Sequence, residues 1–213
     1  MVDDIILGYL LYQNHLAGRD YLVSRILFHA APTLLNVKPA SLLGFDRGLR
    51  SPDQLWRDYR ADFGREFGQT FGVDYFELRE GVAGSLVLFY NSLLLGQTLR
   101  CPENQALLGE RGFPEYEGVE PTLRHLARQC GQTPFPHEIG IFLGIPAPDV
   151  RGFIKHQGRN YLCSGFWKVY QQPDQARQTF ELYDRARLAV AGAAARLQKQ
   201  TPPLAGGVLN QMN

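Results

Sequence analysis

The sequence has little cysteine and no long hydrophobic run. Its 213 residues contain three cysteines, Cys101, Cys130 and Cys163, which are widely spaced and odd in number. This pattern argues against both a secreted disulfide framework and a zinc knuckle, and it favours a reducing compartment. The sequence also has no run of about 18 apolar residues, the length that a membrane-spanning helix requires. We therefore expect a cytoplasmic protein that does not span a membrane.

The short apolar run near the N-terminus differs from a signal peptide. Ile5 to Tyr12 follow Asp3 and Asp4 rather than basic residues, and no small-residue cleavage site lies at the right distance. We expect this segment to be a short helix, or an arm that packs an apolar side onto the body of the protein.

An excess of charge of either sign is absent too. The 22 basic and 21 acidic side chains give a formal net charge of +1. Binding to nucleic acid or to an anionic membrane draws on a concentrated basic surface, so we expect neither as a partner. The glycines fit neither GxGxxG nor GxxxxGK[ST], and the chain has no GxSxG motif, so neither a nucleotide site nor a serine hydrolase is indicated.

What is present is the composition of a globular protein. Hydrophobic residues make up 45% of the chain and aromatic residues 12%, far from the signature of disorder. This length suits a single core. We therefore predict one domain over residues 1–201, followed by a flexible Pro/Gly-rich tail over 202–213.

Hydrophobic periodicity predicts an α/β or α+β fold, with a single mixed sheet of about five strands flanked by helices. The expected strands are residues 40–45, 73–78, 85–90, 139–145 and 161–170. The second and third should form a hairpin. The expected helices are residues 19–31, 51–68, 91–99, 102–108, 121–129, 147–157 and 174–200.

Two of these helices carry specific end signals. Ser51 precedes Pro52, which predicts Ser51 as the N-cap and proline as the first helical residue. His29 falls in the last turn of the helix that starts near residue 19, where the helix dipole favours a protonated imidazole.

The sharpest candidate site pairs His137 and Glu138 with Cys163. His137 and Glu138 come just before the predicted strand 139–145, and Cys163 lies in the predicted strand 161–170. If the two strands are neighbours joined by a right-handed crossover, the residues could approach each other. A thiol beside an imidazole is the minimal nucleophile and base, so we predict Cys163 as nucleophile, His137 as base and Glu138 as the group that orients it.

Two other interpretations use the same region. A metal site would recruit His137 and Cys163, with His29, His156 and Glu138 as further ligands, although their spacing matches neither HExxH nor CxxC. A cofactor site for haem or flavin would use His29, Tyr161, Trp167 and Lys168. Packing in the core is the simpler explanation of the aromatic residues in this stretch.

Three stretches resemble a known family. They are HAAPTLLNVKPASLL (29–43), VLFYNSLLLGQTL (87–99) and FPHEIGIFLGIPAPDVRGFIKHQGRNYLCSGFWKVY (135–170). Together they resemble the bacterial DUF3793 family, a domain of unknown function found in anaerobic Firmicutes. His29, His137 and Cys163 match its pattern. The residue after the first histidine is often cysteine in the family, whereas this chain has Ala30.

The resemblance implies little about activity. The family's association with flavodoxin-like and iron-uptake functions suggests a role in redox chemistry or in metal or haem handling. Three hypotheses therefore stand together. They are a protein that binds a small molecule or a cofactor (haem, flavin or a transition metal), a thiol-dependent enzyme that uses Cys163 and His137, and a non-catalytic adaptor that docks a flavodoxin-like electron-transfer protein.

Overall fold

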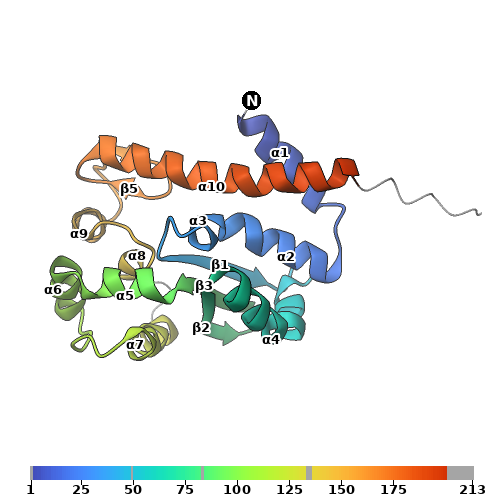
Figure 1. Ribbon diagram of the computed structural model, residues 1–213. Helices are drawn as coiled ribbons and strands as arrows, with labels where there is room; N and C mark the ends of the chain where they lie inside the picture. Colours follow the sequence, from blue (N-terminus) through green and yellow to red (C-terminus); the bar gives the residue numbers. More distant parts are fainter. Residues whose placement is uncertain (1, 49, 83, 133–135, 201–213) are drawn as a thin grey trace, which may run out of the picture.

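A computed structural model describes residues 2–48, 50–82, 84–132 and 136–200 of the chain (Figure 1). Helices and strands are mixed, and helices make up most of the described residues. The helices are α1 (Val2–Gln13), α2 (Gly18–His29), α3 (Ala31–Leu34), α4 (Pro52–Phe71), α5 (Ser92–Arg100), α6 (Pro102–Glu110), α7 (Val119–Gln132), α8 (Ile139–Phe142), α9 (Ala147–His156) and α10 (Pro173–Gln200). Within the described ranges, no helix combines the length and the apolar composition needed to cross a membrane.

The main sheet has three antiparallel strands in the order β1-β3-β2. They are β1 (Ala40–Asp46), β2 (Val73–Gly81) and β3 (Gly84–Asn91). The predicted β2–β3 hairpin is confirmed, and the register shifts between Glu77 and Arg79. Because β3 is the central strand, both of its faces are covered by helices and most of its side chains are buried.

One face of the sheet packs against α4 through an aromatic cluster. Trp56 and Phe63 are seven residues apart and Phe67 four further on, so all three lie on one stripe of the helix. Trp56 is fully buried, and its ring lies parallel to that of Phe45 at 5.0 Å between centroids. Its indole N–H donates to Glu77 Oε1 at 2.6 Å.

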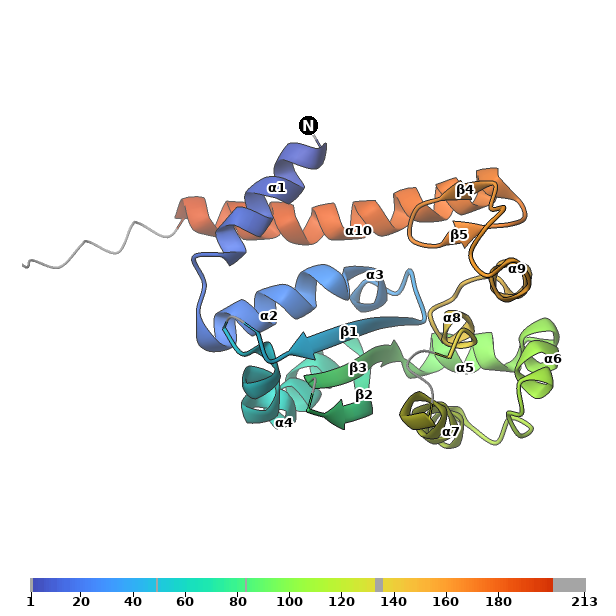
Figure 2. The same ribbon diagram turned by 180° about the vertical axis from the view of Figure 1, so that it is seen from behind.

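The other face of the sheet packs against the helices that follow it. Leu88 and Tyr90 of β3 share a core with Leu95 of α5, Leu126 of α7 and Phe142 of α8. The long helix α10 lies on the far side of α2 and α3, and α1 crosses it (Figure 2). The segment from α8 to the start of α10 therefore connects the helices on this face of the sheet, α5 and α7, to α10.

The predicted strand 139–145 was wrong, because this segment forms helix α8 and a tight turn. Gly144 has φ of +76°, and Ile145 N–H donates to Gly140 O at 2.9 Å, the 6→1 bond of a glycine-terminated helix. Gly140 packs so closely that an added Cβ would lie 2.8 Å from Val150 Cγ2.

The predicted long strand 161–170 was wrong as well. The chain instead forms two short antiparallel strands, β4 (Cys163–Ser164) and β5 (Lys168–Val169), which make their own sheet. Gly165 N–H donates to Trp167 O at 3.1 Å and closes the turn between them. The single sheet of five strands is thus replaced by a sheet of three and a hairpin of two.

The helix predicted after Ser51 is confirmed, but its cap is not. Pro52 is the first residue of α4, whereas Ser51 has φ of 42° and its side chain makes no capping hydrogen bond. The expected tail over 202–213 lies outside the described residues.

Candidate functional site

A pocket of about 380 Å³ lies where α8, α9 and the β4–β5 hairpin meet. This volume is in the range of small-molecule sites. Most of the lining is apolar, with a few polar groups at the hairpin and at the turn before α8. The lining residues are His137, Ile139, Gly140, Leu143, Ile145, Asp149, Val150, Phe153, Ser164, Gly165, Trp167 and Lys168.

Asp149 holds the two sides of this pocket together. Its side chain is 3% exposed and lies in the first turn of α9. Trp167 Nε1 donates to Oδ2 at 2.7 Å, and the backbone N–H groups of Tyr170 and Gln171 donate to Oδ1 at 2.7 and 3.0 Å. Three donors thus satisfy the buried carboxylate, and the hairpin is fixed to α9.

Lys168 brings a positive charge to the pocket. Its Nζ donates to Gly158 O at 2.7 Å, just beyond the C-terminal end of α9. The same ammonium lies 5.1 Å from the ring centroid of Tyr161 and 5.9 Å from that of Phe153. An ammonium group has three donors. One is used by Gly158, so further donors of Lys168 are available to a bound molecule.

His137 lies at the rim of the same pocket. It is exposed, and its ring meets that of Phe153 edge-on at 5.0 Å. His137, Trp167 and Lys168, all predicted from the sequence, therefore share one pocket. Trp167 is buried and forms a wall, whereas Tyr161 is 45% exposed and covers Lys168 from outside.

Glu138 faces away from this pocket. It is 5% exposed, and its Oε2 lies 3.6 Å from Arg111 Nε, beyond α6. Its negative charge also contributes to a raised pKa of the Cys130 thiol on α7, where burial is the main cause. Glu138 therefore contacts the α7 side of the core, and the predicted orientation of His137 by Glu138 has no hydrogen bond to support it in the described residues.

Cys163 is not among the residues that line this pocket. Ser164 and Lys168 are cross-strand partners and both line the pocket, while Cys163 pairs with Val169. Side chains alternate between faces along a strand. Cys163 accordingly packs with the buried cluster of Val169 and Tyr183 at α10. The catalytic pair of Cys163 and His137 stays a prediction, and Cys163 does not line the pocket that His137 lines.

His29 lies elsewhere, at the end of α2. Burial, followed by the positive charges of Arg25 and Arg187, lowers the pKa of His29 to about 4. The protonated imidazole expected from the sequence is therefore not favoured. In the part of the chain that the structure describes, no three His, Cys, Asp or Glu side chains gather closely enough to hold a metal ion. The predicted metal ligands His137 and Cys163 thus lack a third partner there.

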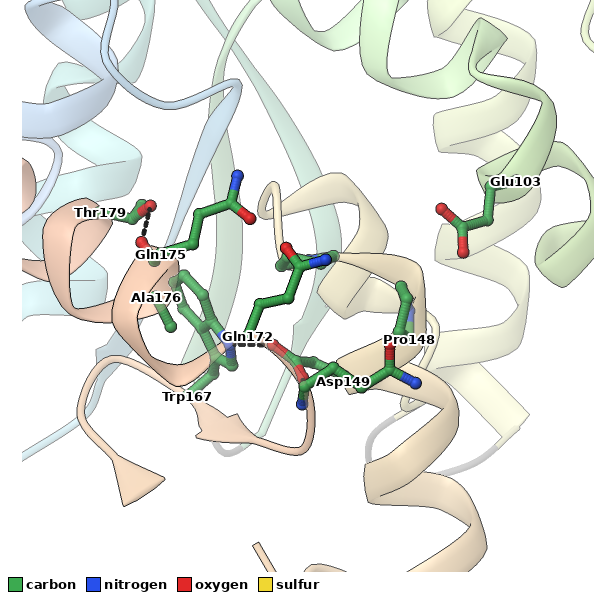
Figure 3. Close-up of a pocket in the computed structure, with 10 residues that line it drawn as sticks. Glu103, Pro148, Asp149, Trp167, Gln172, Gln175, Ala176 and Thr179 are labelled. Atoms are coloured by element: carbon green, nitrogen blue, oxygen red, sulfur yellow. Dashed lines mark hydrogen bonds between the residues drawn. The ribbon is translucent and has the colours of Figure 1, made fainter. Parts of the chain in front are cut away.

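A second, more polar pocket of about 240 Å³ lies behind Trp167 (Figure 3). Gln172 and Gln175 extend into it from the start of α10, and Glu103 of α6 faces them. The Asp149–Trp167 hydrogen bond separates the two pockets, since both residues line each of them.

The sequence interpretation gave Asp149 no role in a site. A usable signal existed for Asp149, because it follows Pro146, Ala147 and Pro148 at a predicted helix start, where carboxylates are favoured. Its partners, however, are 18 to 22 residues away along the chain. No local pattern indicates contacts of that range.

Comparison with known proteins identifies one family. A family model described as "Protein of unknown function (DUF3793)" matches residues 26–201, most of the chain. Neither the curated proteins nor the solved structures that were compared contain a match.

Proposed function

This chain belongs to the DUF3793 family of proteins of unknown function, and we propose that its pocket between α8, α9 and the β4–β5 hairpin binds a small molecule with an apolar body and an anionic group. Lys168 would contact the anion, His137 would hydrogen-bond at the rim, and Trp167 and Phe153 would hold the apolar body.

The observation that carries this proposal is the charge balance of the pocket. Lys168 is its cationic residue, and no ion pair in the described residues neutralises it. The carboxylate of Asp149 is already occupied by three N–H donors. A ligand with a carboxylate, phosphate or sulfonate would therefore supply a negatively charged partner for Lys168, while its apolar body displaces water from the apolar walls of the pocket.

Flavin mononucleotide and haem both combine an aromatic body with anionic groups. We propose them as the specific ligands of this pocket, in a cytoplasmic protein. Each can be added to the purified protein, and its binding can be followed by its visible absorbance. The flavodoxin-like partner and the thiol chemistry of Cys163 remain predictions that no contact in the pocket favours.

Two probes with the same aromatic body test the proposal. 8-Anilinonaphthalene-1-sulfonate carries a sulfonate, and N-phenyl-1-naphthylamine lacks it. We expect saturable binding of the sulfonate probe at one site per chain. Lys168→Met should weaken it about tenfold, the effect of losing about 1.4 kcal/mol of charge-assisted hydrogen bonding, and should leave the uncharged probe unaffected.

Lys155→Met is the matched control. Lys155 lies on α9 in the same stretch of chain, but it is exposed and lies outside this pocket. Equal affinity of wild type and Lys168→Met for the sulfonate probe would refute the role of Lys168. Absence of saturable binding of either probe would refute the pocket as a ligand site.

A further inference from the structure

Two cationic side chains, Lys38 and Arg187, lie around the rings of Tyr183 and Phe166, and the charge of Arg187 acts on Lys38. Lys38 Nζ lies 5.4 Å from the ring centroid of Tyr183, and Arg187 follows Tyr183 by one helical turn. Figure 2 shows the loop that joins α3 to β1 below α10, on the side of the β4–β5 hairpin. Both residues are partly buried.

Aromatic rings fix the position of Arg187. Its guanidinium carbon lies 4.5 Å from the ring centroid of Phe166 and 5.7 Å from that of Phe28. Phe166 also meets Tyr183 edge-on at 5.1 Å. Arg187 is therefore held in place on the same aromatic platform that lies beside Lys38.

Neither cation has a carboxylate partner in the described residues. Arg187 Nε is buried without a hydrogen-bond acceptor, and neither Lys38 Nζ nor the guanidinium forms an ion pair there. Asp184 on α10 acts on Arg187 only at longer range. The neighbouring α2 adds Arg25, whose guanidinium donates to Gly44 O, and His29.

The electrostatics agree with this geometry. Burial, followed by the charge of Arg187, lowers the pKa of Lys38 to about 8. Burial also lowers the pKa of Arg187, against the effect of Asp184. Placing two unpaired cations together costs free energy, which an anion between them would offset.

We propose that Lys38 and Arg187 form a second binding site, for an oxyanion such as a phosphate or a carboxylate group. The planar fork of Arg187 suits two oxygens of such a group, and the ammonium of Lys38 supplies a point charge. This site is separate from the pocket at Lys168, and it does not depend on the function proposed there.

Thermal unfolding with added ions tests the site. Inorganic phosphate and acetate are compared with chloride at equal ionic strength. The ion that binds more tightly shows whether the site prefers a phosphate or a carboxylate group. At about ten times the Kd of the ion, the melting temperature of the wild type should rise by roughly 3 to 6 °C. Phosphate also stabilises proteins because it is excluded from their surface. The deciding result is therefore the difference between the rise in melting temperature of the wild type and that of the site variants.

The variants are Lys38→Met and Arg187→Gln, with Arg185→Gln as the control. Lys38→Met keeps an apolar chain against Tyr183. Arg185 lies on the same helix but is exposed, and its side chain approaches Glu181 at 3.9 Å. Each site variant should weaken binding of the ion at least tenfold, while the control keeps the full shift.

The Nε–Hε signal of Arg187 in ¹H–¹⁵N NMR spectra gives a second readout that does not depend on unfolding. It should move saturably with the ion in the wild type and in Arg185→Gln. A wild type that responds to phosphate and acetate no more than to chloride would overturn the proposal. A rise in melting temperature with the ion that is unchanged in both Lys38→Met and Arg187→Gln would overturn it as well.

Discussion

The two tryptophans of the chain belong to regions that are stabilised in different ways. Trp56 lies among aromatic rings between α4 and the three-stranded sheet, and the Glu77 that accepts its indole N–H also pairs with Arg60. Trp167 lies in the hairpin, where its indole N–H donates to Asp149. Repeated apolar contacts stabilise the first region, whereas one buried carboxylate organises the second.

Loss of Asp149 should have the largest effect. Asp149→Ala leaves the N–H groups of Trp167, Tyr170 and Gln171 without their acceptor, and we expect a loss of about 3 to 5 kcal/mol in the free energy of unfolding. Glu77→Ala in the other region should cost about 1 to 2 kcal/mol, because Glu77 is partly exposed. Urea unfolding followed by tryptophan fluorescence measures both.

Asp174→Ala serves as the control for these substitutions. The Asp174 side chain is 88% exposed and forms an ion pair with Arg177 in the next turn, so its loss should change stability by less than about 0.5 kcal/mol. If Glu77→Ala proved as costly as Asp149→Ala, the contrast between the two regions would be wrong.

Gly165→Ala should have an intermediate effect. An added Cβ would lie 2.4 Å from the ring of Phe180, so the hairpin has to shift away from α10. We expect a cost of about 1 to 3 kcal/mol from overpacking. Gly44→Ala in β1 is the matched change in the sheet, since nothing lies within 4 Å of its added Cβ. Thermal unfolding of the two variants should therefore separate them, and equal melting temperatures would contradict the tight packing of the hairpin.

A pH-dependent effect, smaller than that of Asp149, concerns Asp53, which lies at the start of α4. Burial would raise the pKa of Asp53, but the hydrogen bond from Ser85 and the charges of Arg57 and Arg47 outweigh it and hold the pKa below its ordinary value. The folded state therefore binds this proton less readily than the unfolded state. Asp53 stabilises the fold above the ordinary carboxyl pKa of about 4, and this contribution is lost as the pH falls below that value.

Asp53→Asn should accordingly cost about 1 to 2 kcal/mol at pH 7 and progressively less in acid. Urea unfolding at a series of pH values between 7 and 3 measures the difference between wild type and variant. A difference that does not change with pH would show that the charge of Asp53 is not what stabilises this helix start.

The sequence predicted the region of Trp56 well because its signals are local. Residues 40–45, 73–78 and 85–90 form strands, and the stripe of Trp56 and Phe63 on one helix was visible in the spacing. In residues 136–171 the signals were ambiguous. An apolar run from Ile139 to Ile145 suits a strand or a helix, whereas Gly144 shortly before Pro146 is typical of a helix end.

The candidate pocket contains three residues that the sequence had already singled out. His137, Trp167 and Lys168 were identified from the residues, and they line one pocket. Cys163 and Glu138 were grouped with His137 on the assumption of two neighbouring strands. That assumption failed, and with it the geometric reason for the pair. The organising role of Asp149 depends on contacts across 18 or more residues, which sequence periodicity does not report.

The indole N–H signals of the two tryptophans offer the most direct test of the proposed pocket. ¹H–¹⁵N NMR spectra should show one such signal for each, and a Trp56→Phe variant assigns them. During titration with 8-anilinonaphthalene-1-sulfonate, the account predicts that the Trp167 signal moves saturably while the Trp56 signal stays in place. A Trp167 signal that does not move at saturating probe, or a Trp56 signal that moves in its stead, would contradict a ligand site between α8, α9 and the hairpin.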